Sequence, residues 1–268
     1  LDVNVSGMKR AILEILTSKL ITSIDDIDKF IGYTKISQEN RLSKDSLKEL
    51  KSSSLKYLTD KLFTTANPLS TGFEATKFGI ATVTSSLPPE EALVIYDHFK
   101  SAIRALVLLD DLHIIYQVTP IYFNVEINWN QYLNIWNLLS DSQRYVAEVI
   151  GIKEKSLYNA VNGVGFLMKD SKTYKIYERF YKALILSDLI NEKPFDSIIS
   201  KFKGINRGSL QSLQLQSAMF AGQVRIFLDK LGWSYLGLII DKFSERLQFG
   251  VSEELLDIAR IPSISRKY

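Results

Sequence analysis

The sequence contains no cysteine and only two histidines among its 268 residues. The lack of cysteine excludes disulfide bonds, thiolate metal sites and cysteine nucleophiles, and it is typical of a protein from a reducing compartment. His98 and His113 each lie within an apolar helical pattern, and neither belongs to a cluster of ligand-type residues. We interpret both as structural histidines, and we expect no metal site and no histidine-based catalysis.

Long apolar runs and a strong net charge are also missing. No run approaches the roughly 20 apolar residues of a membrane span, and the first residues lack the pattern of a signal peptide. We therefore expect a soluble chain with no membrane partner. Lysine and arginine number 33 against 30 acidic residues, so any electrostatic attraction to a polyanion must be local.

Phosphate-binding loops and catalytic constellations are absent as well. Gly163-Val164-Gly165 is not followed by the Gly-Lys-Ser/Thr of a P-loop. Two pairs of adjacent carboxylates, Asp110-Asp111 and Glu253-Glu254, point apart if they lie on helices, so we interpret them as helix-capping residues. The chain by itself is expected to have no catalytic residue and no cofactor.

The first third of the chain shows the order of a winged-helix module. Apolar periodicity predicts helices over residues 8–21, 24–33 and 44–62, and turn residues over 63–73 predict a small hairpin, the wing. A helix over 74–86 completes a predicted domain over residues 1–86. Lys48, Lys51 and Lys56 lie on the third helix, and either DNA contact or a solvated face explains them; specific base reading is the less favoured interpretation.

A break at Leu87-Pro88-Pro89 separates this domain from a chain that is helical throughout. The period predicts an irregular bundle of helices over residues 89–108, 110–118, 128–139, 141–150, 153–161, 172–192, 195–203, 206–231 and 233–248. The final residues predict a helix, a turn at Ile261-Pro262-Ser263 and the start of another helix, as in a fragment of a longer protein. The expected fold class is mainly α.

The helix over residues 206–231 is the most informative, because its period separates two faces. The buried stripe is predicted to contain Leu210, Leu213, Ser217, Phe220, Val224, Phe227 and Leu231. A second line at the same pitch is uncharged and contains Ser212, Gln216, Met219 and Gln223, whereas Gln211 and Gln214 lie farther round the helix. Amides and a thioether suit a surface along which a ligand slides.

A basic cluster, Lys201, Lys203 and Arg207, precedes this helix within a run that has no carboxylate between Asp196 and Asp229. A helix N-terminus also favours phosphate. Phosphate contact and exposed, solvated cations are equally good interpretations of the cluster.

Several segments resemble the helicases of the polymerase theta and HELQ type. The stretch from Ile205 to Trp233 has their Arg-Gly, their glutamine-rich helix and Leu-Gly-Trp, and the continuation to Val251 closes on their Leu-x-Phe-Gly-[Ile/Val]. Three further segments, SSLPPEEALVIYDHF, DDLHIIYQVTP and RYVAEVIGIKEKSLYNAVNG, are also similar to that family and closer to its polymerase theta branch. The resemblance spans nearly the whole chain.

This resemblance implies a superfamily 2, Ski2-like DNA helicase without its two RecA-like motor domains. Residues 1–86 would be the winged helix, 87–249 the helical ratchet domain and 250–268 the start of a helix-hairpin-helix element. ATP and Mg²⁺ would bind the motor domains, which are expected partners together with single-stranded or forked DNA. The implied role is 3′ to 5′ translocation in nuclear DNA repair, either in double-strand-break end joining or in crosslink and replication-fork repair.

The ratchet helix would guide the single strand, which makes its polar face the expected contact. The candidate DNA-binding residues are Lys201, Lys203, Arg207, Gln211, Ser212, Gln216, Met219, Phe220 and Gln223. Related archaeal helicases have an arginine and a tryptophan where this chain has Ser212 and Met219, so the stacking residue is missing at that position. Phe220 is the nearest aromatic residue, but the helical period places it on the buried stripe, which favours a core role. The alternative function is a protein-interaction module that does not bind nucleic acid.

Overall fold

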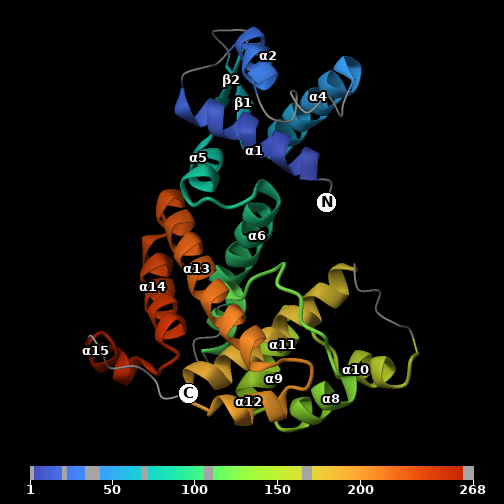
Figure 1. The fold of residues 1–268 in the computed structure, drawn as a ribbon, viewed down its shortest axis with the longest axis vertical. Coiled ribbons are helices and arrows are strands. Elements are labelled where there is room, and N and C mark those ends of the chain that lie inside the picture. Colours follow the sequence, from blue (N-terminus) through green and yellow to red (C-terminus); the bar gives the residue numbers. More distant parts are fainter. Residues whose placement is uncertain are drawn as a thin grey trace. The chain divides into compact units, whose positions relative to one another are not determined.

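The computed structural model describes residues 3–19, 23–33, 43–67, 72–105, 111–164 and 171–261. The described chain is mainly helical, as predicted (Figure 1). It divides into two compact units: unit 1 is Leu1–Val94 with Arg225–Gly237, and unit 2 is Ile95–Val224 with Leu238–Tyr268. Within the described residues, no helix is both long and apolar enough to cross a membrane.

Unit 1 has the predicted order of three helices followed by a hairpin. Its elements are α1 (Val3–Ser18), α2 (Ile24–Tyr33), α4 (Lys44–Asp60), β1 (Thr64–Ala66), β2 (Phe73–Ala75) and α5 (Lys77–Thr84). The two strands are antiparallel, with Thr64 opposite Ala75, and an isolated bridge joins Ser23 to Gly72. Helix α1 packs against α4, α5 and β2. The tip of the predicted wing lies outside the described residues, and its assignment as a winged helix stays a prediction.

Local capping sets the helix boundaries in unit 1. Ser23 and Ser43 accept hydrogen bonds from the backbone N–H groups of Asp26 and Ser46 at the starts of α2 and α4. The predicted helix over 74–86 is wrong at its start, because residues 73–75 pair as a strand. Thr76 then accepts a bond from Gly79 N at 3.1 Å, so α5 begins only at Lys77.

The core of unit 1 includes the end of α13, whose residues 225–231 group with this unit. The Phe78 ring lies 4.6 Å from that of Phe63 and 5.8 Å, edge-on, from that of Phe227, a favourable aromatic geometry. Phe63 and Phe227 are fully buried. Lys51 of α4, a candidate DNA-facing cation, forms an ion pair with Asp28 of α2.

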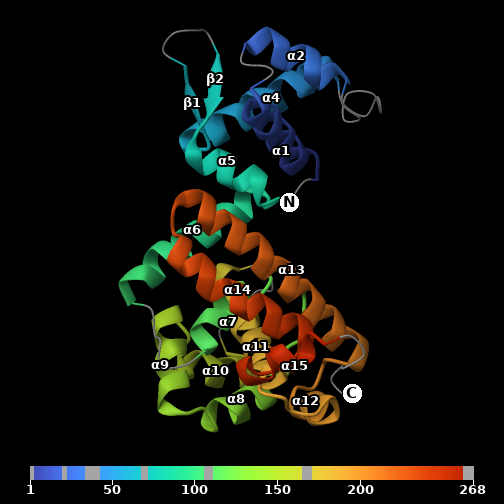
Figure 2. The same ribbon diagram turned by 90° about the vertical axis from the view of Figure 1, so that its left-hand side faces the viewer.

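Unit 2 is a helical bundle. Its elements are the rest of α6 (Pro89–Ala105), α7 (Leu112–Val118), α8 (Trp129–Asn137), α9 (Asp141–Ile150), α10 (Glu154–Val161), α11 (Lys172–Ile190), α12 (Phe195–Lys201), most of α13 (Arg207–Leu231), most of α14 (Ser234–Phe249), the short 3₁₀ turn η1 (Glu253–Leu255) and α15 (Leu256–Ala259). Their bounds lie close to the predicted ones. Both views show α13 and α14 side by side (Figures 1 and 2).

Helix α11 is buried along most of its length, and it carries three buried charged side chains, Glu178, Arg179 and Lys182. Lys182 donates to the carbonyl oxygens of Pro120, at 2.9 Å, and Phe123. Arg179 donates to those of Gln117 and Thr119, both at 2.9 Å, and Glu178 accepts from Val125 N at 3.1 Å. Gln117 lies in the last turn of α7, and the segment between α7 and α8 has no regular structure. The buried side chains of α11 therefore pair backbone groups that no regular element pairs.

The segment after α14 is joined to that helix by ion pairs. Lys242 of α14 lies 2.6 Å from Glu253, and Arg260 pairs with Glu245. Hydrogen bonding from Lys242 holds the pKa of Glu253 below its usual value. The second half of the predicted helix-hairpin-helix element lies outside the described residues, and the element stays a prediction.

Candidate nucleic-acid interface

The two predicted faces of α13 are present. The side chains of the predicted stripe are buried except that of Leu231, which is half-buried: Leu210, Leu213, Ser217, Phe220, Val224 and Phe227. The second line is exposed at Ser212, Gln216 and Met219 and half-buried at Gln223, and Gln211 is exposed too. The separation into a core face and a solvent face is confirmed; DNA contact by the solvent face stays a prediction.

Phe220 belongs to the core face, as its period favours. Its side chain is 6% exposed, so in this structure its ring is not presented to a base. Of the nine candidate contacts, Phe220 is thus the one whose side chain lies inside the bundle.

Gln214 differs from the sequence interpretation, which placed it apart from the core stripe. It is buried, and its Nε2 donates to the carbonyl oxygens of Leu247, at 3.0 Å, and Gln248, at 3.2 Å. Those carbonyls lie in the last turn of α14, where no intrahelical donor is available. The amide therefore joins α13 to the end of α14, which the sequence alone could not show because the acceptors lie on another helix.

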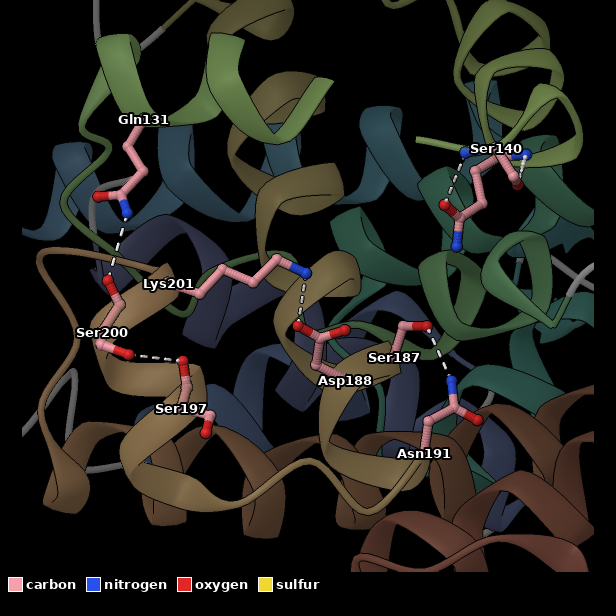
Figure 3. Close-up of polar contacts among 9 residues, drawn as sticks. Gln131, Ser140, Ser187, Asp188, Asn191, Ser197, Ser200 and Lys201 are labelled. Atoms are coloured by element: carbon pink, nitrogen blue, oxygen red, sulfur yellow. Dashed lines mark hydrogen bonds and ion pairs between the residues drawn. The ribbon is translucent and has the colours of Figure 1, made fainter. Parts of the chain in front are cut away.

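The three cations of the basic cluster have different surroundings. Lys201 Nζ lies 2.6 Å from Asp188 Oδ2 of α11 (Figure 3). Lys203 is exposed, and the exposed guanidinium of Arg207 lies 5.8 Å from the Phe195 ring. An acid-free stretch of sequence does not exclude a carboxylate from a neighbouring helix, and Asp188 already neutralises Lys201.

The loop that carries Lys203 is held in place by α8. Gln131 Nε2 donates to Ser200 O at 3.3 Å (Figure 3), and Gln131 Oε1 accepts from Lys203 N at 3.2 Å. Gly204 is required here, since its φ is +100° and an added Cβ would lie 2.5 Å from Glu126 O. These contacts fix the backbone of the loop, so Lys203 and Arg207 are held near the start of α13.

The N-terminus of α13 is already capped. Asn206 Oδ1 accepts from Ser209 N at 2.8 Å and from Ser209 Oγ at 3.0 Å. This cap uses one of the N–H groups that could otherwise bind a phosphate. The side chains of Lys203 and Arg207, more than the helix end itself, are thus the groups available to an anion.

The histidines have structural surroundings, as interpreted. His98 Nδ1 lies 2.9 Å from Arg179 Nη1. Burial, with the charges of Arg179 and His113 beside it, lowers the pKa of His98 to about 3. His113 is buried, and burial lowers its pKa too. Among the described residues, no group of three or more metal-binding side chains forms a cluster.

One of the paired carboxylates was interpreted wrongly. Asp111 forms no capping bond at the start of α7. Its Oδ2 instead lies 2.7 Å from Nη1 of the buried Arg246 on α14. The reason is that a buried guanidinium needs a compensating charge, and this long-range demand outweighs the local preference for a cap.

Sequence reasoning also passed over Leu215. This side chain lies between Ser212 and Met219 on the solvent face, and it is 60% exposed. The signal was present in the sequence, since a leucine four residues before Met219 falls outside the buried stripe.

Known proteins are similar to this chain over most of its length. A family described as "DNA_pol_Q helicase like region helical domain" matches residues 89–247. DNA polymerase theta of Drosophila melanogaster is 34% identical over 274 residues, which cover 97% of this chain and 13% of that protein. DNA polymerase theta of Mus musculus is 38% identical over 192 residues, which cover 70% of this chain and 8% of that protein. Helicase POLQ-like of Homo sapiens is 26% identical over 271 residues, or 96% of this chain and 24% of that protein.

Proposed function

The chain belongs to the family of the helicase-like region of DNA polymerase theta, and from this premise we propose that it is the DNA-binding accessory region of an ATP-dependent DNA helicase. Single-stranded DNA lies along the solvent face of α13, and RecA-like motor domains elsewhere in the whole protein bind ATP and Mg²⁺ and pull the strand. Residues 1–86 act as a winged helix, 87–249 as the ratchet domain and 250–268 as the start of a helix-hairpin-helix element. The process served is nuclear DNA repair, with 3′ to 5′ movement on the strand.

The observation that carries this proposal is the combination of an uncharged solvent face on α13 with two cations at its start. Within the part of the chain that the structure describes, neither Lys203 nor Arg207 has a carboxylate at ion-pair distance. Lys203 and Arg207 hold phosphates without reading sequence, and amides with a thioether contact any base. A strand that must move needs this kind of contact.

A titration at several salt concentrations tests the proposal. The chain should bind a fluorescent oligothymidylate, and the double variant Lys203→Ala/Arg207→Ala should bind it more weakly. Because each phosphate contact on a single strand adds about 0.7 to the slope of log affinity against log salt, losing two should flatten that slope by about 1.4. Lys201→Ala should have a smaller effect, since Asp188 compensates its charge.

A charge-matched control separates this effect from net charge. Lys155 of α10 and Lys172 of α11 are exposed lysines outside α13 and its loop, and the Lys155→Ala/Lys172→Ala variant should keep the wild-type slope. If the wild-type chain does not bind the oligonucleotide at low salt, the protein-interaction alternative replaces the proposal.

A further inference from the structure

The ion pair between Lys201 and Asp188 changes what the basic cluster offers to an anion. Lys201 Nζ, at the end of α12, lies 2.6 Å from Asp188 Oδ2 on α11 (Figure 3). Among the described residues, Asp188 is the only carboxylate at ion-pair distance from the three cations of the cluster. The cluster therefore presents two uncompensated cations, Lys203 and Arg207, although its sequence contains three.

The position of Asp188 is unfavourable for its own helix. Asp188 lies in the last turn of α11, where unpaired carbonyl groups give a helix a partial negative charge that disfavours a carboxylate. Among the described residues, its side chain forms its one hydrogen bond with Lys201. A residue that breaks a local rule usually serves a purpose elsewhere in the molecule, and the contact with Lys201 indicates which purpose.

The backbone on both sides of Lys201 is fixed by Gln131 of α8. Gln131 Nε2 donates to Ser200 O at 3.3 Å, and Gln131 Oε1 accepts from Lys203 N at 3.2 Å. The Lys201 side chain itself is 40% exposed. Because a lysine side chain is long and flexible, Lys201 without its partner can turn to the anion that Lys203 binds.

We propose that Asp188 limits the grip of this region on single-stranded DNA, because it withholds Lys201 from the phosphates. This inference rests on the proposed function and adds to it a residue that weakens the contact. Each additional phosphate contact raises the affinity for a strand, and a strand that moves must be released at every step. Asp188 keeps the cluster at two phosphate contacts, those of Lys203 and Arg207.

Asp188→Asn tests this, because it keeps the size of the side chain and removes its charge. The variant chain should bind a fluorescent oligothymidylate about two- to fivefold more tightly than the wild type at moderate salt. The slope of log affinity against log salt should steepen by about 0.7, the value for one added phosphate contact. Asp188→Asn/Lys201→Ala should lose this gain, since the gain acts through Lys201. Tighter binding cannot arise from misfolding.

Three further variants serve as controls. Glu154→Gln, at the exposed start of α10, removes the same charge and should keep the wild-type slope, which separates the effect from net charge. Asp188→Glu keeps the carboxylate and should bind as the wild type does. Lys201→Ala alone should leave the slope nearly unchanged, because Lys201 is already neutralised.

The whole helicase provides a second readout. Asp188→Asn in the whole protein should slow movement along a single strand, because the strand is held more tightly at each step. Movement at the wild-type rate or faster would show that Asp188 does not serve translocation.

Two binding results overturn the inference while the proposed function stands. If Asp188→Asn binds no more tightly than the wild type, the ion pair is only a structural link between α11 and α12. If Lys201→Ala flattens the slope as much as Lys203→Ala does, Lys201 contacts phosphate in spite of Asp188. If the wild-type chain does not bind the oligothymidylate at low salt, the proposed function fails and this inference fails with it.

Discussion

Neighbouring residues of α13 have opposite surroundings, because one face of this helix packs into the core and the other faces solvent. Phe220 and Met219 are adjacent in sequence, yet Phe220 is 6% and Met219 63% exposed, because successive residues on a helix point about 100° apart. Gln214 and Leu215 reverse the usual preference, with the amide buried and the leucine exposed. The amide is tolerated inside because two carbonyls accept its hydrogen bonds.

Truncating the core face should unfold the protein, whereas truncating the solvent face should not. Phe227→Ala should lower the free energy of unfolding by about 3 to 5 kcal/mol, the usual cost of deleting a buried aromatic ring, and Phe220→Ala should act in the same direction. Met219→Ala should change it by less than about 0.5 kcal/mol. Urea denaturation measures all three, and a loss for Met219→Ala equal to that for Phe227→Ala would show that the faces are assigned wrongly.

His98 should make stability depend on acid. Its pKa is about 3 in the folded chain and near 6.5 in a model compound, so the unfolded state binds the proton more tightly in this range. Stability contributed by neutral His98 is complete above about pH 6.5 and falls by roughly 1.4 kcal/mol for each pH unit below it, until about pH 3. Between about pH 6.5 and about pH 5, wild type should therefore lose about 2 kcal/mol more than His98→Gln. If the unfolding free energies of the two proteins fell by the same amount over that pH range, this prediction would be wrong.

At the scale of elements, α11 organises unit 2 through buried charge. Glu178, Arg179 and Lys182 are directed to backbone groups of the segment between α7 and α8 and do not face water. Burial lowers the pKa of Lys182 to about 8, which reflects the cost of keeping an ammonium away from solvent. This cost is offset by the hydrogen bonds that Lys182 donates to the carbonyl oxygens of Pro120 and Phe123 in the irregular segment.

Lys182→Met keeps the apolar stem of the side chain and removes its donors. The carbonyl oxygens of Pro120 and Phe123 would lose their partner, so unfolding free energy should drop by roughly 2 to 4 kcal/mol. Lys172→Met, at the exposed start of the same helix, is the control and should cost less than about 0.5 kcal/mol. Hydrogen exchange should report faster opening of residues 117–125 in Lys182→Met; equal protection in both variants would mean that Lys182 does not hold this segment.

At the scale of the whole molecule, the chain forms two units that divide α13 between them. Residues 207–224 group with the larger unit and 225–231 with the smaller one, so one helix takes part in two cores. The sequence-based boundary near residue 87 rests on the Leu-Pro-Pro break, while the compact units change within α6, between Val94 and Ile95. The three-part division of the chain stays a prediction.

The isolated chain should hydrolyse no ATP and unwind no duplex. Its sequence has no phosphate-binding loop, and phosphoryl transfer needs a loop and a metal to position the nucleotide. A phosphate-release assay with and without single-stranded DNA checks this, with the whole helicase as the positive control. DNA-stimulated hydrolysis by the 268-residue chain would refute the assignment as an accessory region.

Local features of this protein follow from its sequence alone. The apolar period predicted most helices within a few residues, because the face of a helix is defined by residues three or four positions apart. The same period separated the two faces of α13, and the quoted motifs identified the family. The hairpin was predicted too, but its second strand runs on to Ala75, where a helix was expected, since the extent of a strand depends on its partner.

The tertiary structure alone decided which distant groups meet. Asp188 neutralises Lys201, Asp111 compensates Arg246, and the end of α14 accepts the amide of Gln214. Each partner comes from a different helix, and helical periodicity contains no information about which helices become neighbours. The charge and exposure of the candidate interface were therefore set by the packing of unit 2, although its residues could be named from the sequence.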